Sequence, residues 1–226
     1  MNKIRPVLLL LVSALPLCGA TTVVEEIGSG PLEKSKWKVS GDITAEQGLK
    51  LHAVGDEAGF ANAMMTTASP LPELNFSEKD VEFRLKDLNL TGEAPPAKQA
   101  FVLLLATDKP SEASASSYLR LIFNGDGKMN LAAATGAASD PSKIKNLVSK
   151  TVSFPIKNLQ LLLTKKGYRL TYEDAGGPQS AEGDWGDKLD LGAWGGTSPT
   201  LLMKAVRRPS TGTAEATLGS FTVVNP

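Results

Sequence analysis

The chain has 226 residues with 24 basic and 24 acidic side chains, so its formal net charge at neutral pH is zero. A neutral chain without basic clusters argues against binding to nucleic acid or to an anionic membrane surface. The single cysteine, Cys18, excludes an internal disulfide framework and a thiolate metal site. Burial of apolar surface must therefore stabilise the fold.

Residues 1–20, "MNKIRPVLLLLVSALPLCGA", have the basic start, apolar centre and small-residue end that are typical of a secretory signal. The apolar centre is shorter than the roughly 20 residues that span a bilayer, and no later stretch approaches that length. We expect cleavage after Ala20 and export to the periplasm or the extracellular space, with residues 21–226 as one domain. Lipid attachment at Cys18 is the alternative, although Leu17 is bulkier than the residue that usually precedes a lipidated cysteine.

From Trp37 onward, apolar and polar residues alternate in short runs that are separated by Gly, Pro, Asn, Asp and Ser. Trp37 opens the first of these runs, and we expect it to pack in the core or at a sheet edge. His52, the only histidine, stands opposite the leucines of its run, which predicts an exposed strand residue. The following runs are "VEFRLKDL" (81–88) and "AFVLLLAT" (100–107), with the polar connection "LTGEAPPAKQ" (90–99) between them.

The stretch "YLRLIFNGDGKMNLAAA" (118–134) has two alternating runs around an oxygen-rich centre, Asn-Gly-Asp-Gly-Lys. These letters are compatible with a calcium loop or with a tight hairpin turn. An EF-hand loop that starts at Asn124 would need Glu at its twelfth position, where Thr135 stands. We therefore predict a turn, in which Gly125 and Gly127 adopt positive φ angles.

The second half of the chain continues with "LQLLLTK" (159–165), "YRLTYE" (168–173), "LLMKAV" (201–206) and "LGSFTVV" (218–224). The stretch "EDAGGPQSAEGDWGD" (173–187) has too few apolar residues to form a core and predicts a surface loop. Only 45–47 and 141–146 suggest short helices. The sequence thus predicts an all-β, antiparallel sandwich of about 12 to 14 strands. Its most buried strands are expected at 99–107, 118–124 and 158–173.

The order of these landmarks, from "W-x-V-x-G-D" at 37–42 through "VEFRL", "YLRLIF" and "LQLLLTKKGYRLTYED" to "LGSFTVV", resembles the concanavalin A-like jelly roll. The resemblance covers about 30–226 and is closest to laminin-G-like and 3-keto-disaccharide hydrolase-like domains. It implies that the last strand lies beside the first, for which "TTVVEEI" and "GSFTVVN" are suitable partners. It carries no catalytic signature.

Motifs for catalysis are absent from the sequence. Jelly-roll glucanases carry Glu-x-Asp-x-x-Glu on one strand, so that all three carboxylates point into the cleft, and this chain has no such run. A Gly-x-Ser-x-Gly elbow and a glycine-rich phosphate loop are also missing. One histidine cannot form a zinc triad. The catalytic residues are therefore unknown, and no cofactor is expected, although a weak calcium site built from loops on the sandwich rim is an alternative.

The segment 173–196 is the predicted ligand site, because it combines aromatic, acidic and glycine residues. Trp185 or Trp194 would stack on a sugar ring, while Asp184 or Asp187 would accept hydrogen bonds from its hydroxyls. The alternative is that these tryptophans plug one end of the core. We predict a non-catalytic module that binds a glycan or polysaccharide. The alternatives are a 3-keto-disaccharide hydrolase-like enzyme and an adhesive domain that binds a cell-surface protein.

Overall fold

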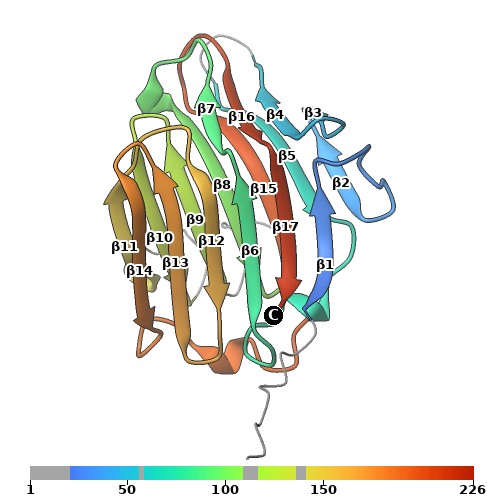
Figure 1. Ribbon diagram of the computed structural model, residues 1–226, viewed down its shortest axis with the longest axis vertical. Coiled ribbons are helices and arrows are strands. Elements are labelled where there is room, and N and C mark those ends of the chain that lie inside the picture. Colours follow the sequence, from blue (N-terminus) through green and yellow to red (C-terminus); the bar gives the residue numbers. More distant parts are fainter. Residues whose placement is uncertain (1–20, 56–58, 109–116, 136–140) are drawn as a thin grey trace, which may run out of the picture.

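The computed structural model describes residues 21–55, 59–108, 117–135 and 141–226. These residues form three sheets of antiparallel strands and four short 3-10 helices (Figure 1). The strands are β1 (Thr22–Ile27), β2 (Trp37–Ser40), β3 (Asp42–Thr44), β4 (Leu49–Ala53), β5 (Ala61–Thr67), β6 (Val81–Lys86), β7 (Asn89–Thr91), β8 (Gln99–Ala106), β9 (Tyr118–Asn124), β10 (Lys128–Ala134), β11 (Ile144–Thr151), β12 (Lys157–Leu163), β13 (Gly167–Asp174), β14 (Gly177–Asp184), β15 (Thr200–Arg207), β16 (Ala214–Leu218) and β17 (Ser220–Asn225). The helices are η1 (Pro72–Leu74), η2 (Pro96–Lys98), η3 (Pro141–Lys143) and η4 (Leu191–Ala193).

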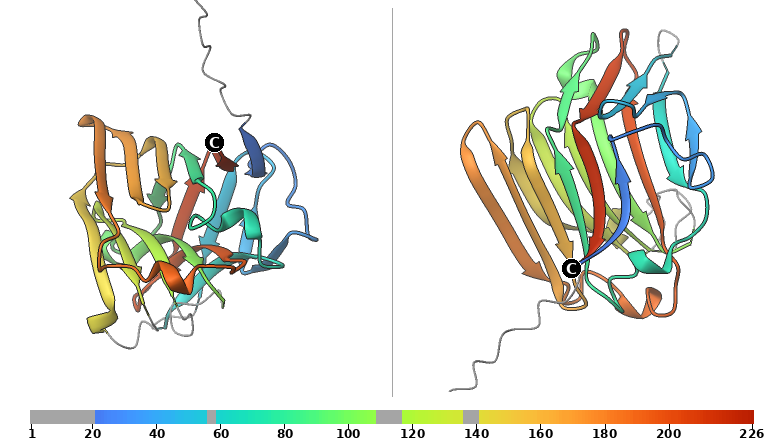
Figure 2. Two further views of the ribbon diagram at one scale, coloured as in Figure 1. Left: turned by 90° about the horizontal axis from the view of Figure 1, so that it is seen from below. Right: turned by 45° about the vertical axis from the view of Figure 1, so that its right-hand side comes forward.

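A six-stranded sheet has the order β1-β17-β6-β12-β13-β14. In it β1 lies antiparallel beside β17, with Thr22 opposite Asn225 and Ile27 opposite Phe221. The first and last strands are therefore adjacent, as the jelly-roll resemblance implies. A seven-stranded sheet has the order β11-β10-β9-β8-β15-β5-β2 and faces the six-stranded sheet across the core (Figure 2). The short strands β3, β4, β16 and β7 make a third sheet at the top of Figure 1.

The core lies between the two large sheets and is filled by alternate strand residues, because successive side chains of a strand point to opposite faces. Phe83 of the six-stranded sheet and Phe101 and Phe123 of the seven-stranded sheet are fully buried there. All eight residues of β8 are buried, which confirms the prediction for 99–107. The prediction for 158–173 is wrong, because β12 and β13 belong to the sheet whose outer face contains exposed residues.

Several sequence-based boundaries differ from the structure. The described residues contain 17 strands rather than 12 to 14, since strands of three or four residues are too short to show an alternating pattern. No helix forms at 45–47, and at 141–146 only the 3-10 turn η3 is present before β11. The predicted loop 173–187 is mostly the hairpin strand β14, whose residues lack apolar character because the strand lies at a sheet edge. Signal residues 1–20 lie outside the described residues.

Candidate functional site

The two tryptophans of the predicted site are core residues. Trp185 is 1% exposed and Trp194 is 0% exposed, and both rings pack against Phe76, at centroid distances of 5.3 and 4.6 Å. The indole of Trp185 donates to the Thr164 carbonyl at 2.8 Å, and that of Trp194 donates to Ser117 Oγ at 3.1 Å. Neither ring has a free face for a sugar, so the stacking role predicted for them is wrong. Both side chains are part of the hydrophobic core, as the alternative prediction for these tryptophans stated.

Asn75 holds the backbone around Trp194 in place. It is fully buried, and its Nδ2 donates to the carbonyls of Trp194 at 2.7 Å and Thr197 at 3.1 Å. Its Oδ1 accepts from the backbone N–H of Ser77 at 3.1 Å and from the Ser77 hydroxyl at 2.6 Å. One side chain thereby ties the chain before β6 to the turn before β15, and the indole of Trp194 is directed inward.

The two aspartates of the predicted site are exposed, whereas the two tryptophans are buried. Asp184 lines an open pocket of about 450 Å³ where β13 begins and β14 ends, hereafter the Asp184 pocket, whereas Asp187 is not part of its lining. The one aromatic side chain in the lining, Tyr168, is buried and donates its hydroxyl to the Leu147 carbonyl. Burial raises the pKa of Tyr168 above its usual value, so its hydroxyl stays protonated as a donor. The lining comprises Leu162, Thr164, Lys166, Gly167, Tyr168, Arg169, Glu182, Gly183 and Asp184.

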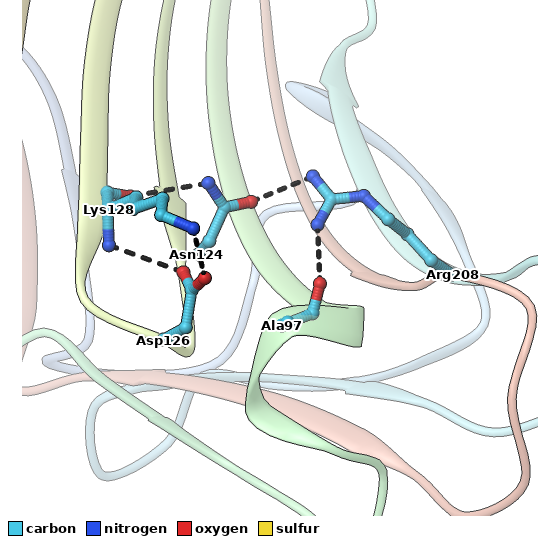
Figure 3. Close-up of polar contacts among 5 residues, drawn as sticks. All are labelled: Ala97, Asn124, Asp126, Lys128 and Arg208. Carbon is cyan, nitrogen blue, oxygen red and sulfur yellow. Dashed lines mark hydrogen bonds and ion pairs between the residues drawn. The ribbon is translucent and has the colours of Figure 1, made fainter.

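The Asn-Gly-Asp-Gly stretch is a hairpin turn between β9 and β10, as predicted. Figure 3 shows that its oxygens already accept from cationic side chains: Asn124 Oδ1 from Arg208 at 2.7 Å, and the Asp126 carboxylate from Lys128 Nζ at 2.8 Å. Gly127 has the expected positive φ of 83°, but Gly125 does not. Glycine at position 125 instead allows the turn to approach the backbone of Pro96 closely, because a Cβ there would lie 2.7 Å from the Pro96 carbonyl oxygen.

His52 is half-buried on β4, and its Nδ1 lies 3.3 Å from Asp42 Oδ2 on β3. The carboxylate of Glu215, on the strand on the other side of β4, pairs with Lys50 at 2.6 Å. Across the described ranges, no three His, Cys, Asp or Glu side chains are grouped as a metal site would require. Likewise, no helix in the described part of the chain has the length and apolar character to cross a membrane.

The outer face of the seven-stranded sheet is closed to solvent in its middle. Val102, Leu104 and Ala106 of β8 point away from the main core, yet they are buried in a second apolar cluster with Leu202 of β15. A ligand cannot reach these four side chains, although Ile122 of β9 and Lys204 of β15 are partly exposed. The hollow on this face lies toward an edge of the sheet.

An open groove of about 370 Å³ occupies that position, on the side of β2, and is hereafter called the β2 groove. Register brings its polar residues together, since Lys38 of β2 pairs with Thr66 of β5, and Thr66 pairs with Leu202, two residues after Thr200. Thr200 is 5% exposed, and its hydroxyl has no hydrogen-bond partner in the structure. The lining comprises Lys38, Val39, Ser40, Met64, Thr66, Thr67, Ala68, Pro70, Asp108 and Thr200.

The β2 groove combines an apolar wall with hydroxyl, ammonium and carboxylate groups. Met64, Ala68 and Pro70 offer the apolar contacts, while Lys38 is an exposed donor. A buried hydroxyl without a partner costs about 1 to 3 kcal/mol, so a ligand oxygen that reaches Thr200 would recover a bond which the fold leaves unmade. The polar residues of this groove could not be recognised from the sequence, because each stands at an ordinary position in or beside an alternating strand.

No protein-family model and no curated protein match this sequence. Solved structures do resemble it. The Ca²⁺-bound exoplasmic/lumenal domain of VIP36 has a TM-score of 0.59 at 11% identity, with 90% of each chain covered. Peanut lectin has a TM-score of 0.56 at 9% identity, covering 91% of this chain and 97% of the lectin.

A family 7 alginate lyase, A1-II′, has a TM-score of 0.52 at 13% identity, covering 84% of this chain and 94% of the lyase. At such identities the similarity shows the fold alone. The fold of this chain is the concanavalin A-like jelly roll, an antiparallel β-sandwich.

Proposed function

We propose that this protein is an exported carbohydrate-binding module that holds a glycan in the β2 groove without cleaving it. The observation that carries the proposal is the buried, unpartnered hydroxyl of Thr200 in a groove with one apolar and one polar side. Structures of the same fold include the lectin UEA-II complexed with galactose and VIP36 with Man3GlcNAc bound. They support the ligand class, whereas the groove supports its position.

A sugar ring matches the groove because it has apolar C–H faces and hydroxyls around its rim. The C–H face would lie against Met64 and Pro70, and the hydroxyls would reach Lys38, Thr66 and Thr200. This arrangement uses aliphatic side chains in place of the tryptophan plates that the sequence suggested.

Binding without cleavage is favoured by the charged groups of the lining. Glycosidases use a pair of carboxyl groups that flank the scissile bond. Among the described residues, Asp108 is the one carboxylate in the β2 groove. A 3-keto-disaccharide hydrolase-like activity is the enzyme alternative, and adhesion to a cell-surface protein is the other.

The test is a glycan array with the parent protein, followed by calorimetric titration of the best ligand with Thr200→Val and Lys38→Ala. Thr200→Val keeps the shape of the side chain and removes the hydroxyl. We expect it to weaken binding about five- to tenfold, the equivalent of one hydrogen bond. The melting temperature should stay the same or rise, because the hydroxyl has no partner in the fold.

The control is Asp184→Asn in the Asp184 pocket, which should leave the affinity unchanged. If Asp184→Asn weakens binding while Thr200→Val does not, the site lies at 173–196 and the β2 groove is not the site. If the parent binds no glycan, the carbohydrate proposal is overturned. Chromatography of the ligand after incubation tests cleavage, and release of products would contradict the non-catalytic part.

A further inference from the structure

Strand β1 is an open edge of the six-stranded sheet. It stands at the end of the strand order and pairs with β17 alone among the described strands. Figure 1 shows β1 beside β17, with β2 of the other large sheet further out on the same side. An open strand edge presents backbone N–H and C=O groups that an added extended segment can pair with.

Two adjacent hollows run along β1. One, of about 320 Å³, lies against Val23–Ile27 and the chain from Ser29 to Trp37. The other, of about 380 Å³, lies against Thr22–Glu25 and the segment after β5. They share four lining residues, and the two together are hereafter called the β1 groove. The shared residues are Val23, Val24, Glu25 and Lys36.

The lining of the β1 groove is acidic. It contains one cation, Lys36, whose Nζ lies 3.1 Å from Glu33 and 3.7 Å from Glu25. The hydrogen bond that Lys36 donates to Glu33 and the charge of Glu25 raise the pKa of Lys36, which therefore stays charged. The lining also contains four carboxylates, those of Glu25, Glu26, Glu33 and Glu73. Because the carboxylates outnumber the one ammonium group, the lining favours a cationic occupant.

Trp37 gives a second, independent indication of an occupant. It is 3% exposed and lines the β1 groove, and its Nε1–H has no acceptor in the structure. The indoles of Trp185 and Trp194 both have acceptors. A buried N–H without a partner is costly, and the carbonyl of a bound chain would satisfy it.

We propose that the β1 groove binds an extended, basic peptide segment of a partner protein by strand addition to β1. A peptide backbone supplies a carbonyl for the indole N–H of Trp37 and both kinds of group for the open edge, while Lys or Arg side chains match the glutamates. The β-bulge between Val23 and Glu25 interrupts the regular edge, so the added strand can pair over a short segment only. Thr67 is the one lining residue that the β1 groove shares with the β2 groove, and the proposal for the β1 groove does not depend on glycan binding.

The probe is a fluorescently labelled peptide of eight alternating Lys and Val residues, titrated into the full protein and followed by anisotropy. One control peptide replaces Lys by Glu, and another carries N-methyl groups on alternate backbone amides. We expect the Lys-Val peptide to bind, the Glu-Val peptide not to bind, and N-methylation to weaken binding at least tenfold. Equal binding of the N-methylated peptide would show charge attraction without strand pairing and would overturn the proposal, as would no binding at all.

Two variants place the site. Trp37→Phe removes the indole N–H while keeping an aromatic ring, and Glu26→Gln removes one charge from an exposed position on β1. Each is expected to weaken binding about threefold or more. Glu215→Gln, the same change on the four-stranded sheet, should leave the affinity unchanged. If Glu215→Gln weakens binding as much as Glu26→Gln does, the peptide is held by the general charge of the protein, and the proposal fails.

Discussion

Removal of the Asn75 amide tests how the segment around Trp194 is held. Asn75→Ala deletes both hydrogen bonds to the Trp194 and Thr197 carbonyls and both bonds from Ser77. The Trp194 carbonyl keeps a partner, because the Thr197 hydroxyl also donates to it at 2.9 Å. The Thr197 carbonyl and the Ser77 N–H lose their hydrogen bonds to the Asn75 side chain. With about 1 kcal/mol for each lost bond to the backbone and up to about 1 kcal/mol for the groups left unpaired, the expected loss is about 2 to 4 kcal/mol.

The measurement is urea unfolding followed by tryptophan fluorescence, with the free energy of unfolding taken from the midpoint and slope. The matched control is Asn89→Ala, since the Asn89 side chain accepts one bond, from the adjacent Leu90 N–H. That variant should lose less than about 0.5 kcal/mol. If the free energy of unfolding of Asn75→Ala lies within about 0.5 kcal/mol of that of the parent, the stabilising role assigned to the Asn75 amide is refuted.

Three further predictions concern stability, all measured by urea unfolding. Gly127→Ala should cost about 1 to 3 kcal/mol of unfolding free energy, because φ is 83° and a Cβ would lie 2.6 Å from a backbone oxygen. The control Gly177→Ala, at a positive φ in open space, should cost less. Equal losses in the two variants would contradict the close contact at Gly127. Trp185→Phe should cost about 2 to 3 kcal/mol, through a cavity and a lost hydrogen bond; a loss below about 0.5 kcal/mol would contradict its core role. Lys128 lowers the pKa of Asp126, so the carboxylate stabilises the fold above the unfolded value near 3.8 and that contribution vanishes as the pH falls through the lowered pKa. Asp126→Asn should thus cost less than about 1 kcal/mol at pH 7 and nothing near pH 2, and a difference that persists in acid would refute the pairing.

Strands that bury one or both faces could be predicted from the sequence, because burial selects apolar residues at the period of a strand. Residues 100–106 of the predicted run lie within β8, whose eight residues are all buried, and the turn at 124–128 follows from glycines between two alternating runs. The strand β14 could not be predicted, because it lies at a sheet edge and most of its residues face solvent. Polar composition there reflects exposure rather than a loop.

The candidate site could not be predicted, because it is formed across strands that are distant in the sequence. Whether Trp194 faces solvent or core depends on Phe76 and on the amide of Asn75, which lies 119 residues earlier. Lys38, Thr66 and Thr200 come from β2, β5 and β15 and become neighbours through strand order and register. Neither the packing of Trp194 nor the cross-strand proximity of these three residues leaves a local pattern in the sequence.

The bound glycan can be located by two-dimensional NMR of the isotopically labelled protein during titration with the best ligand from the array. If the glycan occupies the β2 groove, the amide signals of Lys38–Ser40, Thr66–Ala68 and Thr200 should shift together and saturate at one stoichiometric equivalent. Signals of 166–169 and 182–184 should stay in place. Shifts confined to the second group, or no shifts at saturating glycan, would contradict the assignment of the β2 groove as the carbohydrate site.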